Sequence, residues 1–304
     1  MAKRWISNFW VWSVGIVLLC TLPLAAQQMI SPLAQQQHSR QAVLVQLAQA
    51  EVVYLGETHD SAKDHEAQLE IIRSLYRLRP KIAIALEMFQ RPYQGVLDRY
   101  LRGALTEAEL REQSQYNQRW SYPWQFYAPL LRFAKEHRLP LVALNTPTEV
   151  TRKVAGQGLE SLTPAEQQYI PAIAEIDTSN SVYRQQIFET YQAFHQDQGS
   201  SVAFDHFFQA QVLWDETMAD AIAQFLQAHP GYQVIVLAGK GHIAYGYGIP
   251  SRVARRMAKV SDQLGTKFVQ YSVLLNPDEE TDKFNETPAA DYFWHHLDFN
   301  QQHK

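Results

Sequence analysis

The stretch that most constrains the fold is residues 51–60, EVVYLGETHD, where an apolar run breaks at a glycine into polar residues. Residues 52–55 are large and apolar, and Glu57 and His59 follow the glycine. Ser61 is a good N-cap residue, and an amphipathic pattern begins after it. A buried strand followed by a turn and a helix starts an α/β unit. Ligands in such folds lie beyond the carboxyl ends of the parallel strands.

Later apolar runs repeat this plan. Residues 81–89 end near Glu87, residues 139–145 end at Asn145, residues 232–242 end at His242, and a last strand is expected at residues 267–275. Helical patterns separate these runs, so the sequence predicts an α/β fold with a mainly parallel sheet flanked by helices. Residues 156–200 carry no strand pattern. They predict a small helical insertion that lies over the strand ends.

The N-terminal segment differs from the rest of the chain. Lys3 and Arg4 precede an apolar run at residues 9–26 that ends in small residues. This pattern is typical of a secretory signal, and its length leaves an uncleaved membrane anchor as the alternative. Lipidation at Cys20, the single cysteine, is a further alternative, although Leu19 stands where a lipobox needs a small residue.

The expected organisation has four parts: a signal peptide or anchor at 1–26, a linker at 27–44, an α/β domain at 45–275 containing the insertion at 156–200, and a C-terminal tail at 276–304. A length of 304 residues suits one domain with an insertion. The net charge is −4 and no long basic run occurs, which argues against nucleic acid as a partner. The N-terminus predicts export to the periplasm or cell envelope, with anchoring through that segment as the alternative.

The polar residues at the strand ends are the strongest candidate site. Glu57, His59, Glu87 and His242 follow three different strands, and a parallel sheet places such ends near one another. Two imidazoles and two carboxylates can divide acid and base roles in catalysis. His59, Glu87 and His242 can instead bind a divalent metal. The simpler alternative is that each side chain caps a helix or bonds the local backbone.

Two other segments are candidates: WSYPWQFY at residues 120–127 and GKGHIAYGYGIPSR at residues 239–252. Their aromatic side chains either pack in the core or form the wall of a pocket for a large flat ligand. Gly239 and Gly241 would let the second segment lie against a ligand, and Arg252 would meet an anionic group near a helix N-terminus. The sequence has no GxSxG, P-loop or CxxC, which argues against serine hydrolases, nucleotide-binding enzymes and thioredoxins.

Five motifs in chain order make this sequence resemble the ChaN-like haem-binding proteins: VVYLGETHD, ALEMF, WSYPWQFYAPLLRFAKEHRLPLVALNTP, FFQAQVLWDETMA and LAGKGHIAYGYGIPSR. The resemblance covers residues 45–275 and implies a haem-binding domain with a parallel sheet and a small helical part. It also implies export, often as a lipoprotein, and a link to iron and haem uptake. It further implies that haem binds as a face-to-face pair across a dimer, through tyrosine and histidine. The weak lipobox at Cys20 departs from the lipoprotein members.

The resemblance also implies site residues. For haem it implies histidine and tyrosine, for which His242, Tyr245 and Tyr127 are the candidates, the two tyrosines by position alone. Arg252, Gly239 and Gly241 are further candidates from their places in the segment at residues 239–252. The wider superfamily includes erythromycin esterases and TIKI proteases, whose GE-H, strand-end glutamate and GxxH motifs form a catalytic or metal site. Here these motifs match Glu57, His59, Glu87 and His242.

Two functions therefore stay open. The first is an exported haem-binding protein of the cell envelope in haem or iron uptake, with a homodimer formed on haem binding and an envelope haem transporter as partner. The second is a metal-dependent hydrolase, an esterase or peptidase, with a divalent metal at the Glu57, His59, Glu87 and His242 constellation.

Overall fold

The computed structural model describes residues 28–31, 36–195, 201–278 and 288–295. The expected signal peptide or anchor at residues 1–26 lies outside these ranges. The described strands are β1 (Gln28–Ser31), β2 (Gln36–Ser39), β3 (Val52–Glu57), β4 (Ile82–Gln90), β5 (Leu141–Asn145), β6 (Gln233–Gly239), β7 (Gln270–Leu275) and β8 (Tyr292–Trp294).

These strands form one sheet in the order β2-β1-β8-β7-β3-β6-β4-β5. All neighbours from β8 to β5 are parallel, whereas β1 is antiparallel to both β2 and β8. The predicted α/β class with a mainly parallel sheet is confirmed. The order also shows why distant segments meet, because β6 lies between β3 and β4 in the sheet although it follows both in the chain.

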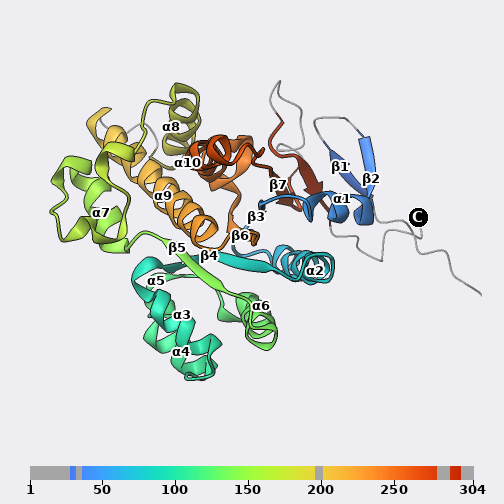
Figure 1. Ribbon diagram of the computed structural model, residues 1–304. Helices are drawn as coiled ribbons and strands as arrows, with labels where there is room; N and C mark the ends of the chain where they lie inside the picture. Colours follow the sequence, from blue (N-terminus) through green and yellow to red (C-terminus); the bar gives the residue numbers. More distant parts are fainter. Residues whose placement is uncertain (1–27, 32–35, 196–200, 279–287, 296–304) are drawn as a thin grey trace, which may run out of the picture.

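Helices cover both faces of the sheet (Figure 1). One face packs against α1 (Arg40–Leu47), α2 (Ala62–Leu78), α3 (Gln94–Leu101), α4 (Glu107–Gln113), α5 (Tyr116–Arg119) and α6 (Trp124–His137). The other face packs against α9 (Ser201–Ala228) and α10 (Ile249–Leu264). The molecule is thus a three-layer α/β/α sandwich.

The alternation of β3 shows how the sequence builds these layers. Val53 and Leu55 point to the α2 side, and Val52 and Tyr54 point to the α9 side. Each of these four side chains is fully buried. A strand with apolar residues at every position is therefore the one that helices cover on both faces.

The region of the expected insertion is helical in its described part. It contains the end of α7 (Thr148–Gln157), short 3-10 turns at Leu159–Ser161, Glu166–Tyr169 and Ile173–Glu175, and α8 (Ser181–His195). Its apolar side chains form a separate cluster with the first half of α9. The described residues of this segment include no strand.

The sheet extends beyond the five strands that the sequence predicted. β8 lies in the segment assigned to the C-terminal tail and becomes the sixth parallel strand, beside β7. β1 and β2 lie in the segment assigned to the linker. Each has only three or four residues, which is too short for an alternating pattern to stand out.

The outer edge at β5 is covered by a side chain. The amide of Gln94, at the start of α3, donates to the carbonyl of Leu141 at 2.8 Å and accepts from the N–H of Ala143 at 2.7 Å. These are the two bonds that a neighbouring strand would make. Gln94 thus ties α3 to the sheet and pairs part of an edge that would otherwise be open.

Candidate functional site

The strand order brings the carboxyl ends of β3, β6 and β4 side by side. Glu57, the last residue of β3, lies opposite Gly239, the last residue of β6. Oε2 of Glu87 on β4 accepts a hydrogen bond from the N–H of Gly239 at 2.7 Å. His59 and His242 follow β3 and β6 directly. The structure therefore places all four strand-end residues, two carboxylates and two imidazoles, at one edge of the sheet.

Glu57 is nearly fully buried and fixes the orientation of His59. Its Oε1 accepts from Nδ1 of His59 at 2.8 Å and from the Tyr127 hydroxyl at 2.7 Å, and its Oε2 accepts from Gln68 at 2.5 Å. Burial raises the pKa of the Glu57 carboxyl, but the bond from His59 and the field of His65 outweigh it, so the pKa is lowered overall. A charged Glu57 keeps the proton on Nδ1 of His59 and leaves Nε2 for another partner.

The ring of His59 is enclosed by aromatic side chains and a glycine. Its centroid lies 4.8 Å from that of Trp120 and 4.7 Å from that of Tyr122. A Cβ at Gly239 would lie 2.9 Å from Cε1 and Nε2 of the ring, so a larger residue there would force the ring to move. Burial lowers the pKa of His59, but the bond to Glu57 and the charge of Glu87 raise it above its ordinary value overall.

His242 lies between two carboxylates. Its Nδ1 is 2.7 Å from Oδ1 of Asp215, and its Nε2 is 3.5 Å from Oε1 of Glu87. Burial opposes the charged ring, but Glu87 and Asp215 outweigh it and raise the pKa of His242 to about 9. The imidazole is therefore protonated at neutral pH; its Nδ1–H donates to Asp215, and its Nε2 lies within ion-pair distance of Glu87.

Asp215 belongs to this site, and the sequence analysis did not select it. It is fully buried on α9, and its Oδ2 accepts from the Tyr183 hydroxyl on α8 at 2.6 Å. The available signal was its setting: Asp215, Glu216 and Thr217 are consecutive polar residues in a helix that is otherwise apolar around them. All three have no exposed surface. Buried polar side chains need hydrogen-bond partners, so a run of them inside an apolar helix indicates a place where other polar groups gather.

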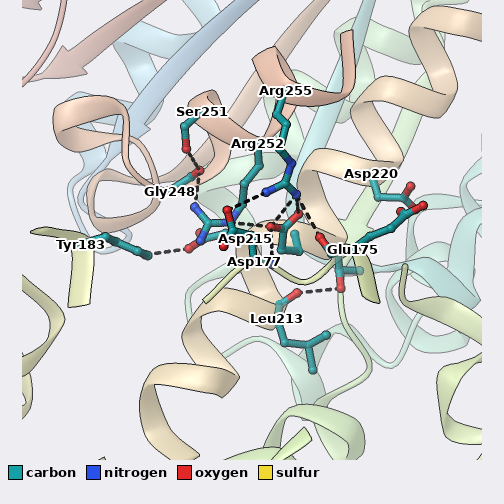
Figure 2. A network of polar contacts seen from close by, with 12 residues as sticks. Glu175, Asp177, Tyr183, Leu213, Asp215, Asp220, Gly248, Ser251, Arg252 and Arg255 are labelled. Atoms are coloured by element: carbon teal, nitrogen blue, oxygen red, sulfur yellow. Dashed lines mark hydrogen bonds and ion pairs between the residues drawn. The ribbon is translucent and has the colours of Figure 1, made fainter. Parts of the chain in front are cut away.

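The neighbouring Glu216 anchors a cluster of arginines. Figure 2 shows two of them, Arg252 and Arg255, close to Asp215. It is fully buried, and its carboxylate accepts from Arg255 and from Arg256, each at 2.7 Å. Arg252 lies 3.3 Å from it and donates to the carbonyl oxygens of Tyr247 and Gly248. The sequence analysis expected Arg252 to meet an anionic group of a ligand. The structure instead buries this guanidinium, where it ties α10 to α9.

A pocket of about 480 Å³ opens beside the four strand-end residues. This volume falls in the range of about 300–1,000 Å³ that ligand pockets occupy. Its aromatic lining comes from Trp120, Tyr122, Phe207 and Trp214. The other lining residues are polar, charged or small: His59, Glu87, Gln90, Arg119, Ser121, Asn145, Thr146, Thr148, Thr151, Arg152, Ala155, Ala210, Gln211 and His242. The pocket thus joins both imidazoles to a partly aromatic wall and two arginines.

The two tyrosines selected from the sequence lie elsewhere. Tyr127 is buried and its hydroxyl donates to Glu57, below the pocket lining. Tyr245 stacks on Tyr247, with ring centroids 6.3 Å apart, and its N–H donates to the carbonyl of Ala289. The phenol that lines the pocket is Tyr122. Gly241 faces open space, since no described atom lies within 4 Å of a Cβ built there.

The residues fit haem better than a resident divalent metal. Within the part of the chain that the structure describes, no group of three or more His, Cys, Asp or Glu side chains is arranged to hold a metal ion. His59 and His242 each bond a carboxylate through Nδ1, which orients the rings, and Nε2 of His59 is left for a ligand. A haem group needs an imidazole or phenolate, apolar walls and cations for its propionates. The pocket lining supplies each of these.

Comparison with known proteins finds the same fold in a solved structure. The ChaN protein of Campylobacter jejuni, whose structure is described as showing cofacial haem binding, superposes with a TM-score of 0.65 at 19% identity, over 88% of this chain and 95% of that one. An erythromycin esterase mutant in its open conformation has a TM-score of 0.45 at 15% identity, over 82% of this chain and 76% of that one. The first likeness is one of fold.

A curated relative is Protein RETICULATA-RELATED 5, chloroplastic, of Arabidopsis thaliana, which is 27% identical over 277 residues. The match spans 84% of this chain and 35% of the relative, so the chain corresponds to about a third of that protein. The family described as haem-binding uptake, Tiki superfamily, ChaN matches residues 43–253. With most of its length matched, the chain belongs to the ChaN family of haem-binding uptake proteins in the Tiki superfamily.

Proposed function

We propose that this protein binds haem in the pocket at the carboxyl ends of β3, β6 and β4. The observation that carries the proposal is the convergence of two carboxylate-bonded imidazoles on a pocket with an aromatic wall. Membership of a haem-binding family supports the same ligand. The flat apolar face of haem suits Trp120, Tyr122 and Trp214, which line this pocket.

His59 is the best-placed ligand for the haem iron. Its side chain is 22% exposed, its Nδ1 is held by Glu57, and its Nε2 is left for the pocket. Tyr122 would supply a phenol beside it. His242 is already bonded to Asp215 and faces Glu87, so its proton and charge are better suited to bonding the ligand than to ligating iron. Haem iron accepts axial imidazole or phenolate.

The proposal includes export and a role in haem or iron uptake or handling in the cell envelope, with an envelope haem transporter as partner. The apolar segment at residues 9–26 supports export, and it lies outside the described residues. Among the residues that the structure describes, no helix is long and apolar enough to cross a membrane.

A homodimer that forms on haem binding is part of the same proposal. A ligand bound only in the dimer stabilises the dimer by mass action. Light scattering of purified protein with and without haemin measures this directly. A monomer at saturating haemin would remove the dimer from the proposal and leave haem binding intact.

Haemin titration followed by the Soret band tests the proposal itself. Wild-type protein should give a saturable shift, and His59→Ala and Tyr122→Phe should weaken or alter it. Tyr245→Phe is the matched control, because that phenol stacks on Tyr247 outside the pocket lining. A spectrum that responds to Tyr245→Phe and not to Tyr122→Phe would place haem elsewhere. Absence of any saturable shift would contradict haem binding.

A second function is favoured by one observation: His59 and His242 are each paired with a carboxylate and flank Glu87. Such pairs orient imidazoles for acid and base catalysis. We therefore keep hydrolysis of an ester or peptide as the second candidate, with His59 as the base. Turnover of model esters or peptides that is abolished in both Glu57→Gln and His59→Ala, with no response to haemin, would favour this function.

A further inference from the structure

One end of the pocket is built by the β5–α7 junction. β5 ends at Asn145, Thr146 follows, and Pro147 precedes the ten residues of α7. Thr146, Thr148, Thr151 and Arg152 all line the pocket. No described side chain caps the N-terminus of α7. The positive end of the helix dipole lies at the pocket, and Glu149 is the acidic side chain of its first turn.

Buried polar atoms at this end lack partners. Thr146 is 1% exposed, and its Oγ1 has no hydrogen-bond partner among the described residues. The same holds for Oδ1 of Asn145, which is 7% exposed and whose Nδ2 donates to the carbonyl of Glu87. A buried hydroxyl left without a partner is costly, so a group that bonds it is expected in the functional state.

The charges at this end are uneven. Arg119 forms a two-bond pair with Glu149, at 2.9 and 3.1 Å, and donates to Gln90. Glu149 is 68% exposed, so this pair lies at the pocket mouth. Arg152 is exposed, lines the pocket and interacts electrostatically with Glu149. An anion at this end would therefore compete with the solvent-exposed Glu149 for the guanidinium of Arg152.

We propose that the β5–α7 end of the pocket is a carboxylate-binding subsite. A carboxylate there accepts from the Thr146 hydroxyl and pairs with Arg152, in the field of the α7 N-terminus. The unpaired Asn145 oxygen is an acceptor and would repel a carboxylate in contact, which directs the carboxylate to the Thr146 side and leaves Asn145 to bond water. This rests on the proposed haem function, in which the carboxylate is a haem propionate.

Comparison of haemin with its dimethyl ester tests the subsite, since the ester keeps the ring and iron and removes both charges. Wild-type protein should bind haemin roughly tenfold or more tightly than the ester, as a charge-assisted hydrogen bond predicts. Thr146→Val and Arg152→Gln should each bring that ratio of affinities toward one, mainly by weakening the binding of haemin. Arg102→Gln is the matched control, because Arg102 is exposed in a different cavity. Thermal melting checks that each variant is folded.

The outcomes separate the subsite from the proposed function. Equal affinities of wild-type protein for haemin and the ester would overturn the subsite and leave haem binding standing. A ratio that survives in both Thr146→Val and Arg152→Gln would place the carboxylate elsewhere and overturn the subsite as well. Saturable binding of neither compound would overturn the haem function and the subsite together. A ratio lost in both variants and kept in the control supports the subsite.

Discussion

Nδ1 of His242 lies 2.7 Å from Oδ1 of Asp215, and the other oxygen of that carboxylate accepts from Tyr183 at 2.6 Å. One carboxylate on α9 thus connects α8 to the turn that follows β6. The orientation of His242 at the pocket is thus set by the helix that precedes β6 in the chain.

Asp215→Asn should therefore destabilise the protein. An amide of the same shape gives His242 a weaker partner, and about 1–3 kcal/mol of unfolding free energy should be lost at pH 7. Urea unfolding measures the change. Asp205→Asn on the same helix is the control, since Asp205 is 45% exposed and paired with Arg184 at the surface. Equal losses of unfolding free energy in the two variants would show that Asp215 stabilises the fold no more than a surface carboxylate does.

The raised pKa of His242 makes stability depend on pH with a defined sign. Its pKa is about 9 in the folded protein against an ordinary value of 6.5. The stabilisation is fully present below pH 6.5 and is lost as the pH rises through about 9; the difference corresponds to about 3 kcal/mol. Unfolding free energies of wild type and His242→Gln should converge with rising pH. A constant gap at every pH would contradict the assignment.

Glu216→Gln should be among the most damaging single changes. It leaves Arg252, Arg255 and Arg256 without the buried charge that they share. Removing one partner of a buried ion pair costs about 3–5 kcal/mol. Glu175→Gln is the control, because the Glu175 side chain is 61% exposed and its carboxylate makes only a long contact, 3.8 Å, with Arg256. Similar melting temperatures for both variants would show that the buried cluster does not stabilise the fold.

Gly239→Ala should weaken haemin binding about tenfold or more and cost about 1–3 kcal/mol of stability. The added Cβ would lie 2.9 Å from the ring of His59 and push that ring from its place. Gly241→Ala, two residues on, meets no described atom within 4 Å and should change either property little. Soret titration and urea unfolding of the two variants are the measurements. An unaffected Gly239→Ala protein would argue that the position of His59 does not determine binding.

Export is tested on the protein from its native envelope. N-terminal sequencing should find a chain that begins near Gln27, as the residues preceding it predict. A start at Met1 or Ala2 would support an uncleaved anchor. An acylated Cys20 would support a lipoprotein.

Much of the fold follows from the sequence because each core strand is a long apolar run between helical patterns. β8 and the β1–β2 pair were not predicted, since three or four residues carry too little periodicity. The positions of Glu57, Glu87 and His242 follow from the same logic, because residues at the ends of adjacent parallel strands share an edge. That logic needs only strand boundaries.

The rest of the site depends on how loops and helices pack against the sheet, which the sequence constrains poorly. Tyr122 and Tyr127 are five residues apart, yet one lines the pocket and the other lies beneath it, bonded to Glu57. Asp215 and Arg252 stand inside helices, and only the packing of α9 on α10 decides which partners they reach. Rotating either helix by one residue, about 100°, would turn these side chains toward other neighbours.

The amide of Gln94 also bears on how two copies of this chain can associate. Because it occupies the carbonyl of Leu141 and the N–H of Ala143, it stands where a second sheet would dock against β5. A dimer made by continuing the sheet across that strand would first have to break both bonds and release the start of α3. Pairing of protomers through other surfaces carries no such penalty.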